Sequence, residues 1–131
     1  MYTIEKTSYG AKITFSGFIR AEEMSNWVEE SEHFLRLMPS KYGVLVDMRG
    51  LNPLPADSQK EMEKGQQLYK AKGMERSAVI LDSTITTLQF IRIAKESGIY
   101  QWERYIDATK VSNWEEVGIK WLKDGIDPDK S

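Results

Sequence analysis

Residues 42–62 read YGVLVDMRGLNPLPADSQKEM, and this stretch decides the fold. Its first part, Gly43–Val46, is a continuous apolar run ending at Asp47, which predicts a strand covered on both faces. After a loop with two prolines, Asp57-Ser58 predicts the capped start of a helix. In an α/β domain, ligands and partners usually bind where the carboxyl end of a central strand faces a helix N-terminus. The stretch is therefore the first candidate site.

The remaining sequence predicts the elements around this strand. Alternating patterns over Tyr2–Thr7 and Ala11–Gly17 predict an antiparallel hairpin. Further strands are predicted over Ser77–Leu81 and Trp102–Ala108, the latter more peripheral because its faces are mixed, and helices over Ala21–Met38, 57–72, 84–97 and from a cap at Asn113. The order ββαβαβαβα predicts a single α/β domain over residues 1–131, a sandwich with a mainly parallel sheet.

Two local features, a glycine inside a predicted helix and a polar chain end, bear on how ordered these elements are. Gly65 falls in the middle of the helix predicted over 57–72, where glycine costs up to about 1 kcal/mol relative to alanine. Either Gly65 allows close packing of this helix on the sheet, or the helix is mobile. The polar end of the chain, residues 126–131, is expected to fray.

Composition narrows the class of function. The chain has 131 residues and a formal net charge of −2, which gives no electrostatic reason to expect nucleic acid or an anionic membrane. It contains no cysteine, no apolar run long enough for a membrane span and no signal-peptide pattern at its start, so we expect a cytoplasmic protein. Arg49-Gly50-Leu51-Asn52 lacks the tandem glycines of a phosphate-binding loop, and no cofactor is predicted.

Few residues offer catalytic chemistry. Asp47 and Asp82 each end an apolar strand, so they either form a carboxylate pair or a Mg²⁺ site, or they hydrogen-bond the loops that follow. No third ligand is spaced with them, which favours the second interpretation and predicts no metal site. His33 is the only histidine and stands beside acids on a predicted helix. No catalytic constellation is recognised, and we expect a protein that is not an enzyme.

The loop between the strand and the helix predicts a contact surface. Leu51 and Leu54 alternate with prolines where solvent exposure is expected, and exposed apolar residues on a stiff loop suit a partner. The alternative is that both leucines fold back onto the core. Asp47, Leu51, Leu54, Asp57 and Ser58 are the binding candidates. The leading hypothesis is a non-enzymatic module that binds a protein partner through residues 50–58 and the following helix start.

The helix predicted over 84–97 carries more apolar residues than one sheet contact needs. Leu88, Phe90 and Ile91 are candidates to line a pocket or to form a homodimer contact, and the alternative is a helix buried between its neighbours. A pocket beside this helix would make the protein a binding domain for a small apolar ligand or lipid, which is the second functional hypothesis.

The pattern of elements and three segments resemble a known family. The segments are VLVDMRGLNPLPADS (44–58), RSAVILD (76–82) and NWEEVGIKWL (113–122). They are similar to the STAS fold of sulfate-transporter and anti-sigma-factor-antagonist domains, in its SpoIIAA-like branch, which has also been compared with CRAL-TRIO lipid-transfer domains. In anti-sigma-factor antagonists, an Asp-Ser-Ser/Thr-Gly helix start is phosphorylated at its second hydroxyl residue. Asp57 and Ser58 match the first two positions, whereas Gln59 replaces the phosphoacceptor, so the resemblance leaves Ser58 as a substitute acceptor.

Overall fold

The computed structural model describes residues 1–130, and its element order matches the order that the sequence predicts. The elements are β1 (Tyr2–Lys6), β2 (Gly10–Phe15), α1 (Ala21–Leu35), β3 (Tyr42–Asp47), α2 (Ala56–Ala71), β4 (Met74–Leu81), α3 (Thr84–Ser97), the short 3₁₀ helix η1 (Tyr100–Trp102), β5 (Glu103–Asp107) and α4 (Trp114–Asp124). None of the helices in this described part combines the length and the apolar character needed to cross a bilayer.

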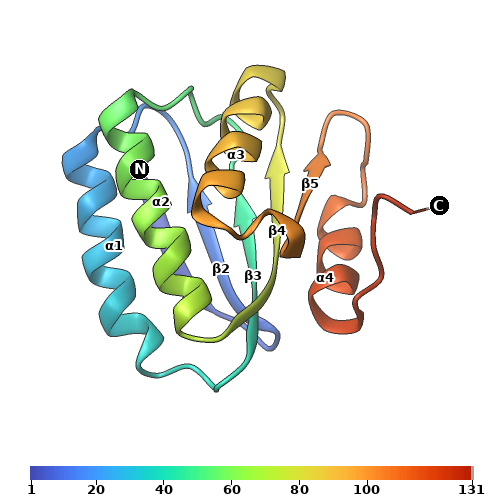
Figure 1. Ribbon diagram of the computed structural model, residues 1–131. Helices are drawn as coiled ribbons and strands as arrows, with labels where there is room; N and C mark the ends of the chain where they lie inside the picture. The colour runs from blue at the N-terminus through green and yellow to red at the C-terminus, as the bar shows by residue number, and fades with distance from the viewer. Residues whose placement is uncertain (131) are drawn as a thin grey trace.

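One five-stranded sheet organises the molecule, with strand order β1-β2-β3-β4-β5. β1 runs antiparallel to β2, and β2 to β5 are parallel, as predicted. Each crossover moves one strand in the same direction, so right-handed connections place α1, α2 and α3 on one face (Figure 1). Only α4 covers the other face, where it packs on β3, β4 and β5.

The two faces of the sheet bury separate apolar clusters. All six residues of β3 are buried, which confirms that its continuous apolar run is the centre of the sheet. The larger cluster lies under α1 to α3 and includes Trp27, Tyr69 and Phe90. The smaller cluster lies under α4, where Gly118 lets the helix approach Leu45 so closely that a Cβ atom would meet the leucine side chain.

Helix α1 is one turn shorter than predicted. It ends at Leu35 instead of Met38, because the next residues form a tighter turn. The amides of Arg36, Leu37 and Met38 each donate to a carbonyl three residues earlier, which is the pattern that closes many helix ends. Pro39 then follows and prevents continuation.

The polar end of the chain, expected to fray over 126–131, contacts the fold at Asp127. Arg104 donates from Nε and Nη2 to the two carboxylate oxygens of Asp127, at 2.9 and 3.0 Å. The hydrogen bonds from Arg104 lower the pKa of Asp127 to about 2. Such two-point contacts fix geometry as well as charge. Ser131 lies outside the described residues.

Gly65 accounts for the contact between α1 and α2. The indole of Trp27 stacks on Tyr69, with ring centroids 5.6 Å apart, and it meets Phe15 edge-on at 5.1 Å. Gly65 faces this indole, and a Cβ atom on Gly65 would overlap the ring. The glycine therefore serves close packing, as one of the two interpretations of its position proposed, but the packing is on α1 and not on the sheet.

We predict that Gly65→Ala destabilises the protein by about 1–3 kcal/mol. The added methyl group must displace an indole that is held on both sides, and this cost exceeds the gain of up to about 1 kcal/mol in helix propensity. Chemical denaturation measures the effect. The control is Gln67→Ala, an exposed position on the same helix, which should change stability by less than about 0.5 kcal/mol. Equal stability of Gly65→Ala and wild type would contradict the proposed contact.

Candidate functional site

The loop after β3 folds inward, so the predicted exposure of its leucines is wrong. Leu51 and Leu54 are each only 3% exposed and belong to the larger apolar cluster. Leu51 forms a parallel bridge with Gly17, and the amide of Asn52 donates to the carbonyl of Gly17. The loop thus continues the sheet past the end of β3 and turns its leucines into the core, as the alternative interpretation proposed.

Helix α3 clamps this loop from the other side. Gln89 accepts a hydrogen bond from the amide of Leu54 at 2.8 Å and donates to the carbonyl of the same residue at 2.9 Å. The hydroxyl of Thr86 donates to the carbonyl of Leu51. Because both sides of the loop are hydrogen-bonded, loop and helix form one rigid framework at the carboxyl edge of the sheet.

Ser58 and Asp57 do not form the predicted helix cap. Helix α2 begins at Ala56 after Pro55, and the carboxylate of Asp57 accepts a hydrogen bond from the amide of Ser58 within the first turn. Ser58 is fully buried, and its hydroxyl donates to the carbonyl of Ile19 at 2.9 Å. A kinase cannot reach this hydroxyl in the folded protein, which removes the basis for Ser58 as a substitute phosphoacceptor. Asp57 stays exposed.

Asp47 and Asp82 each bind the loop instead of each other. Asp47 is buried and accepts hydrogen bonds from the Arg49 guanidinium at 2.9 and 3.0 Å. Burial alone would raise the pKa of Asp47, but the hydrogen bonds and charge of Arg49 outweigh it and lower this pKa. Asp82 accepts the amide of Gly50 through both oxygens at 3.1 Å. Within residues 1–130, no group of three or more acidic, histidine or cysteine side chains is placed to hold a metal ion.

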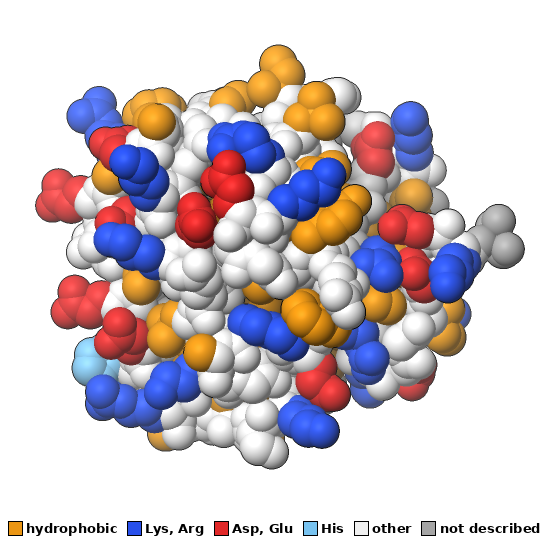
Figure 2. Space-filling model, in the orientation of Figure 1, with side chains coloured by type: hydrophobic (Ala, Val, Ile, Leu, Met, Phe, Trp, Pro, Cys, Tyr) orange, Lys and Arg blue, Asp and Glu red, His pale blue; other side chains and the backbone are white. Residues whose placement is uncertain are grey.

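Three other apolar side chains are exposed at this carboxyl edge. Phe18 follows β2 and is 54% exposed, while Ile85 and Leu88 lie in the first turns of α3 and are 66% and 62% exposed. We call these three residues the apolar rim. Figure 2 shows hydrophobic side chains gathered at the top of the molecule, above the N-terminal end of α3 in Figure 1. Beside the rim, Leu88 and Asp82 line a surface crevice of about 270 Å³ at the ends of β4 and β5.

The structure separates the three candidates that the sequence groups on α3. Leu88 points to solvent at the rim, Ile91 is half-buried, and Phe90 is fully buried against the sheet. Phe90 lines an internal cavity of about 30 Å³ between the sheet, α2 and α3. A pocket beside α3 was predicted, and this cavity occupies that place, but its volume suffices for only about one or two water molecules.

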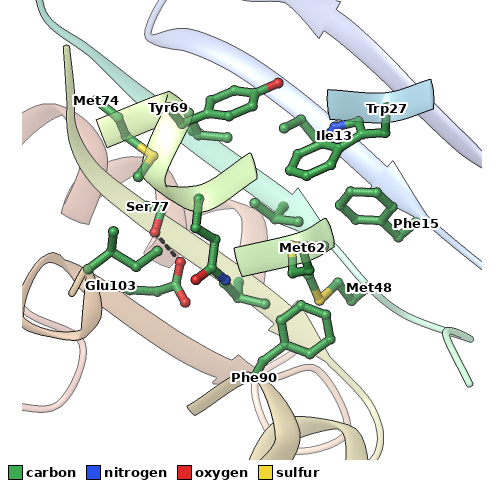
Figure 3. Close-up of a pocket in the computed structure, with 15 residues that line it drawn as sticks. Ile13, Phe15, Trp27, Met48, Met62, Tyr69, Met74, Ser77, Phe90 and Glu103 are labelled. Carbon is green, nitrogen blue, oxygen red and sulfur yellow. Dashed lines mark hydrogen bonds between the residues drawn. The ribbon is translucent and has the colours of Figure 1, made fainter. Parts of the chain in front are cut away.

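The cavity is apolar except at one end. Figure 3 shows Trp27 and Phe15 at one end, Met48, Met62 and Phe90 along one side, and Glu103 joined to Ser77 at the other end. Side chains of this kind form the wall of many ligand sites, in which a few polar groups converge among apolar ones. Methionine side chains are flexible and adapt their shape to what they contact.

Glu103 is the least expected residue of the cavity. It is 4% exposed, and its two carboxyl oxygens accept hydrogen bonds from Ser77 at 2.5 Å and Tyr105 at 2.7 Å. Burial raises the pKa of Glu103 to about 7, against the opposing effect of these two hydrogen bonds. Glu103 forms no ion pair with any residue that the structure describes. A carboxyl group with such a pKa exchanges its proton near neutral pH, a property often found at functional sites.

The burial of Glu103 is hard to predict from the sequence. The alternation in β5 puts Glu103 with Tyr105 and Asp107 on one face of a peripheral strand, where acids are normally solvated. The available signal was Ser77, the polar first residue of the strand predicted over Ser77–Leu81, because Ser77 is the register partner of Glu103 in the parallel β4–β5 pair. This pairing can be recognised only once the register between β4 and β5 is known.

Comparison of the chain with models of protein families found no match, and comparisons with curated proteins and with solved structures found no significant match. The resemblance to the STAS fold therefore stays a prediction beyond the order of elements. The apolar rim and the Glu103 cavity are the candidate functional sites.

We predict that the free energy of unfolding decreases as the pH rises from about 4.5 to about 7 and then levels off. The pKa of Glu103 is about 7 in the fold against an ordinary value of 4.5, so in this range the folded protein binds a proton that the unfolded chain has lost. The decrease attributable to Glu103 is about 3 kcal/mol, at about 1.4 kcal/mol per pKa unit. Urea denaturation at pH 4.5 to 8 measures it.

Glu103→Gln keeps a neutral polar side chain of the same shape and should remove this decrease, which makes the variant more stable than wild type at pH 8. Glu96→Gln, an exposed acid on α3, is the matched control and should follow the wild-type profile. A wild-type stability that is constant or rises over this range would show that Glu103 is ionised in the fold at its ordinary pKa.

Proposed function

We propose that the protein is a non-enzymatic, STAS-like interaction module that binds a protein partner through the carboxyl edge of its sheet. The contact surface consists of the apolar rim and the exposed residues of the loop over 50–58, Asp57 among them. The observation that carries the proposal is the exposure of Phe18, Ile85 and Leu88 at one edge of an otherwise well-buried core. The absence of cysteine from the chain fits our further proposal that it acts in the cytoplasm.

The framework under the rim supports this assignment. Exposed apolar side chains bind partners best when little conformational freedom is lost on association. Ile85 adjoins Thr86, whose hydroxyl is bonded to the loop, and Phe18 adjoins Gly17, which bridges to Leu51. The rim is therefore carried by backbone that is already ordered. The neighbouring crevice of about 270 Å³ offers space for one side chain of a partner.

We predict that a variant with Phe18→Ser, Ile85→Ser and Leu88→Ser loses its partner and keeps its fold. The three side chains are more than half exposed, so their replacement should change the free energy of unfolding by less than about 1.5 kcal/mol in total. Binding should weaken by at least about tenfold, because apolar anchors of an interface typically contribute more than 1 kcal/mol each. Quantitative affinity enrichment from the source cells compares the variant with wild type.

The matched control is Leu37→Ser, because Leu37 is 76% exposed and lies after α1, at the opposite edge of the sheet. It should retain every partner that wild type retains. Identical partner profiles for the rim variant, Leu37→Ser and wild type would disprove the proposal. Gel filtration of the same proteins tests self-association: a dimer lost only in the rim variant would identify a second copy of the chain as the partner.

A second candidate function has one specific observation in its favour. The Glu103 cavity lies beside α3 and is walled by apolar side chains, as expected for a domain that binds a small apolar ligand or lipid. Its volume of about 30 Å³ is roughly a tenth of the smallest typical ligand pocket. A lipid would therefore require α2 and α3 to move apart, with the three cavity methionines adjusting to the new shape.

For this candidate, native mass spectrometry of the purified protein should reveal a bound molecule. Phe90→Ala enlarges the cavity, so the amount bound should increase, whereas Leu88→Ala at the exposed rim should leave it unchanged. A mass equal to that of the chain alone, in wild type and in Phe90→Ala, would contradict the candidate.

A further inference from the structure

A hollow of about 250 Å³ lies at the amino edge of the parallel strands, at the opposite end from the apolar rim. It is formed by the last turn of α2, the start of β4, η1 and α4. The residues that line it are Lys70, Glu75, Arg76, Trp102 and Trp121. We call it the tryptophan hollow. The lining therefore brings together two cations and two indole rings, none of which belongs to the apolar rim or to the Glu103 cavity.

Each cation of the hollow lies against one of the indoles. The Lys70 ammonium is 4.0 Å from the ring centroid of Trp102, and the Arg76 guanidinium carbon is 5.5 Å from that of Trp121. Trp121 is itself fixed, because its indole N–H donates to the carbonyl of Ser77 at 3.0 Å. Attraction between a cation and the face of an aromatic ring thus holds both charges in defined places.

Hydrogen bonds within the protein use only some of the N–H donors of Lys70 and Arg76. Lys70 donates to the carbonyl of Met74 at 3.1 Å, and Arg76 donates to the carbonyl of Leu122, near the end of α4, at 3.2 Å. A lysine has three N–H donors and an arginine five, so most of the donors have no protein acceptor. The Nε–H of Arg76 is buried and has no hydrogen-bond partner among residues 1–130. Buried N–H groups are normally hydrogen-bonded, so this group favours the binding of an acceptor.

The charges are also not neutralised by neighbouring acids. In the described residues 1–130, neither Lys70 nor Arg76 takes part in an ion pair. Arg104 lies 4.4 Å from the Trp121 ring, but its guanidinium is bound to Asp127. Glu75 is the only acid of the lining and points to solvent, so the lining carries two positive charges against one negative charge.

We propose that the tryptophan hollow binds the anionic oxygen group, carboxylate or phosphate, of a small molecule between Lys70 and Arg76. Both cations prefer such oxygens as acceptors, and charge-assisted hydrogen bonds of this kind are the stronger ones. The indole rings exclude water from one side of each cation, which strengthens its attraction for an anion. The volume of the hollow exceeds what the oxygens alone require and leaves room for the body of the molecule.

The test is a titration followed through the indole N–H signal of Trp102 in ¹H–¹⁵N spectra, assigned by its loss in Trp102→Phe. Sodium phosphate, phenyl phosphate and sodium benzoate are compared with sodium chloride at equal ionic strength. We expect a saturable shift with at least one of the three anions and none with chloride. Binding of both phosphates but not benzoate assigns the phosphate class, and binding of benzoate alone assigns carboxylates.

Four charge variants decide whether the shift reports this site. Lys70→Gln and Arg76→Gln should weaken binding by about tenfold or more, because each removes a charge-assisted contact. Glu75→Gln should strengthen binding, because it removes the only negative charge of the lining. Lys72→Gln, an exposed lysine two residues beyond Lys70, should leave the affinity unchanged.

The opposite effects of Lys70→Gln and Glu75→Gln keep the test decisive even if Arg76→Gln fails to fold. A linear, non-saturable response, or equal affinities in Lys70→Gln, Glu75→Gln and wild type, would overturn the proposal. Neither outcome bears on the apolar rim, which lies at the other end of the strands.

Discussion

The burial of β3 and β4 on both faces is the constraint on which the rest of the structure depends. β3 is buried at all six positions and β4 from Ser77 to Leu81, so a helical layer must cover each side of the sheet. The crossovers put α1, α2 and α3 on one face, and a single helix, α4, has to cover the other. Gly118 makes this possible by letting α4 sit directly on Leu45, and the indole of Trp121 ties the helix to the β4 backbone.

The direction of the crossovers also explains where the carboxyl edge of the sheet is closed by packed loops. In doubly wound domains, a crevice opens where neighbouring connections leave the sheet on opposite faces. Here α1, α2 and α3 all lie on one face, and between them the loops pack together without such a crevice in the described chain. Leu51 and Leu54 fill the space, and hydrogen bonds that Gln89 and Thr86 donate to the carbonyls of these leucines close it. From β2 to β4 the edge is consequently a closed surface, and the crevice of about 270 Å³ lies at the ends of β4 and β5, where α3 and α4 leave the sheet on opposite faces.

The fold was predictable from the sequence because its signals are local. The runs around Val44–Val46 and Ala78–Leu81 indicate buried strands without reference to any other part of the chain. The site residues depend on distant partners. Leu51 is buried because it bridges to Gly17, and Glu103 because it pairs in register with Ser77. Such contacts follow from strand alignment, which a single sequence leaves open.

Strand β5 connects the three places that the structure singles out. Trp102, immediately before it, lines the tryptophan hollow, Glu103 closes the internal cavity, and the ring of Tyr105 lines the crevice beside the apolar rim while its hydroxyl holds Glu103. A buried carboxyl without a counter-charge lowers stability above its pKa, and hydrogen bonds from Ser77 and Tyr105 offset only part of that loss. Above that pKa, the charge on Glu103 therefore weakens the contact between β5 and β4, where Ser77 is its register partner.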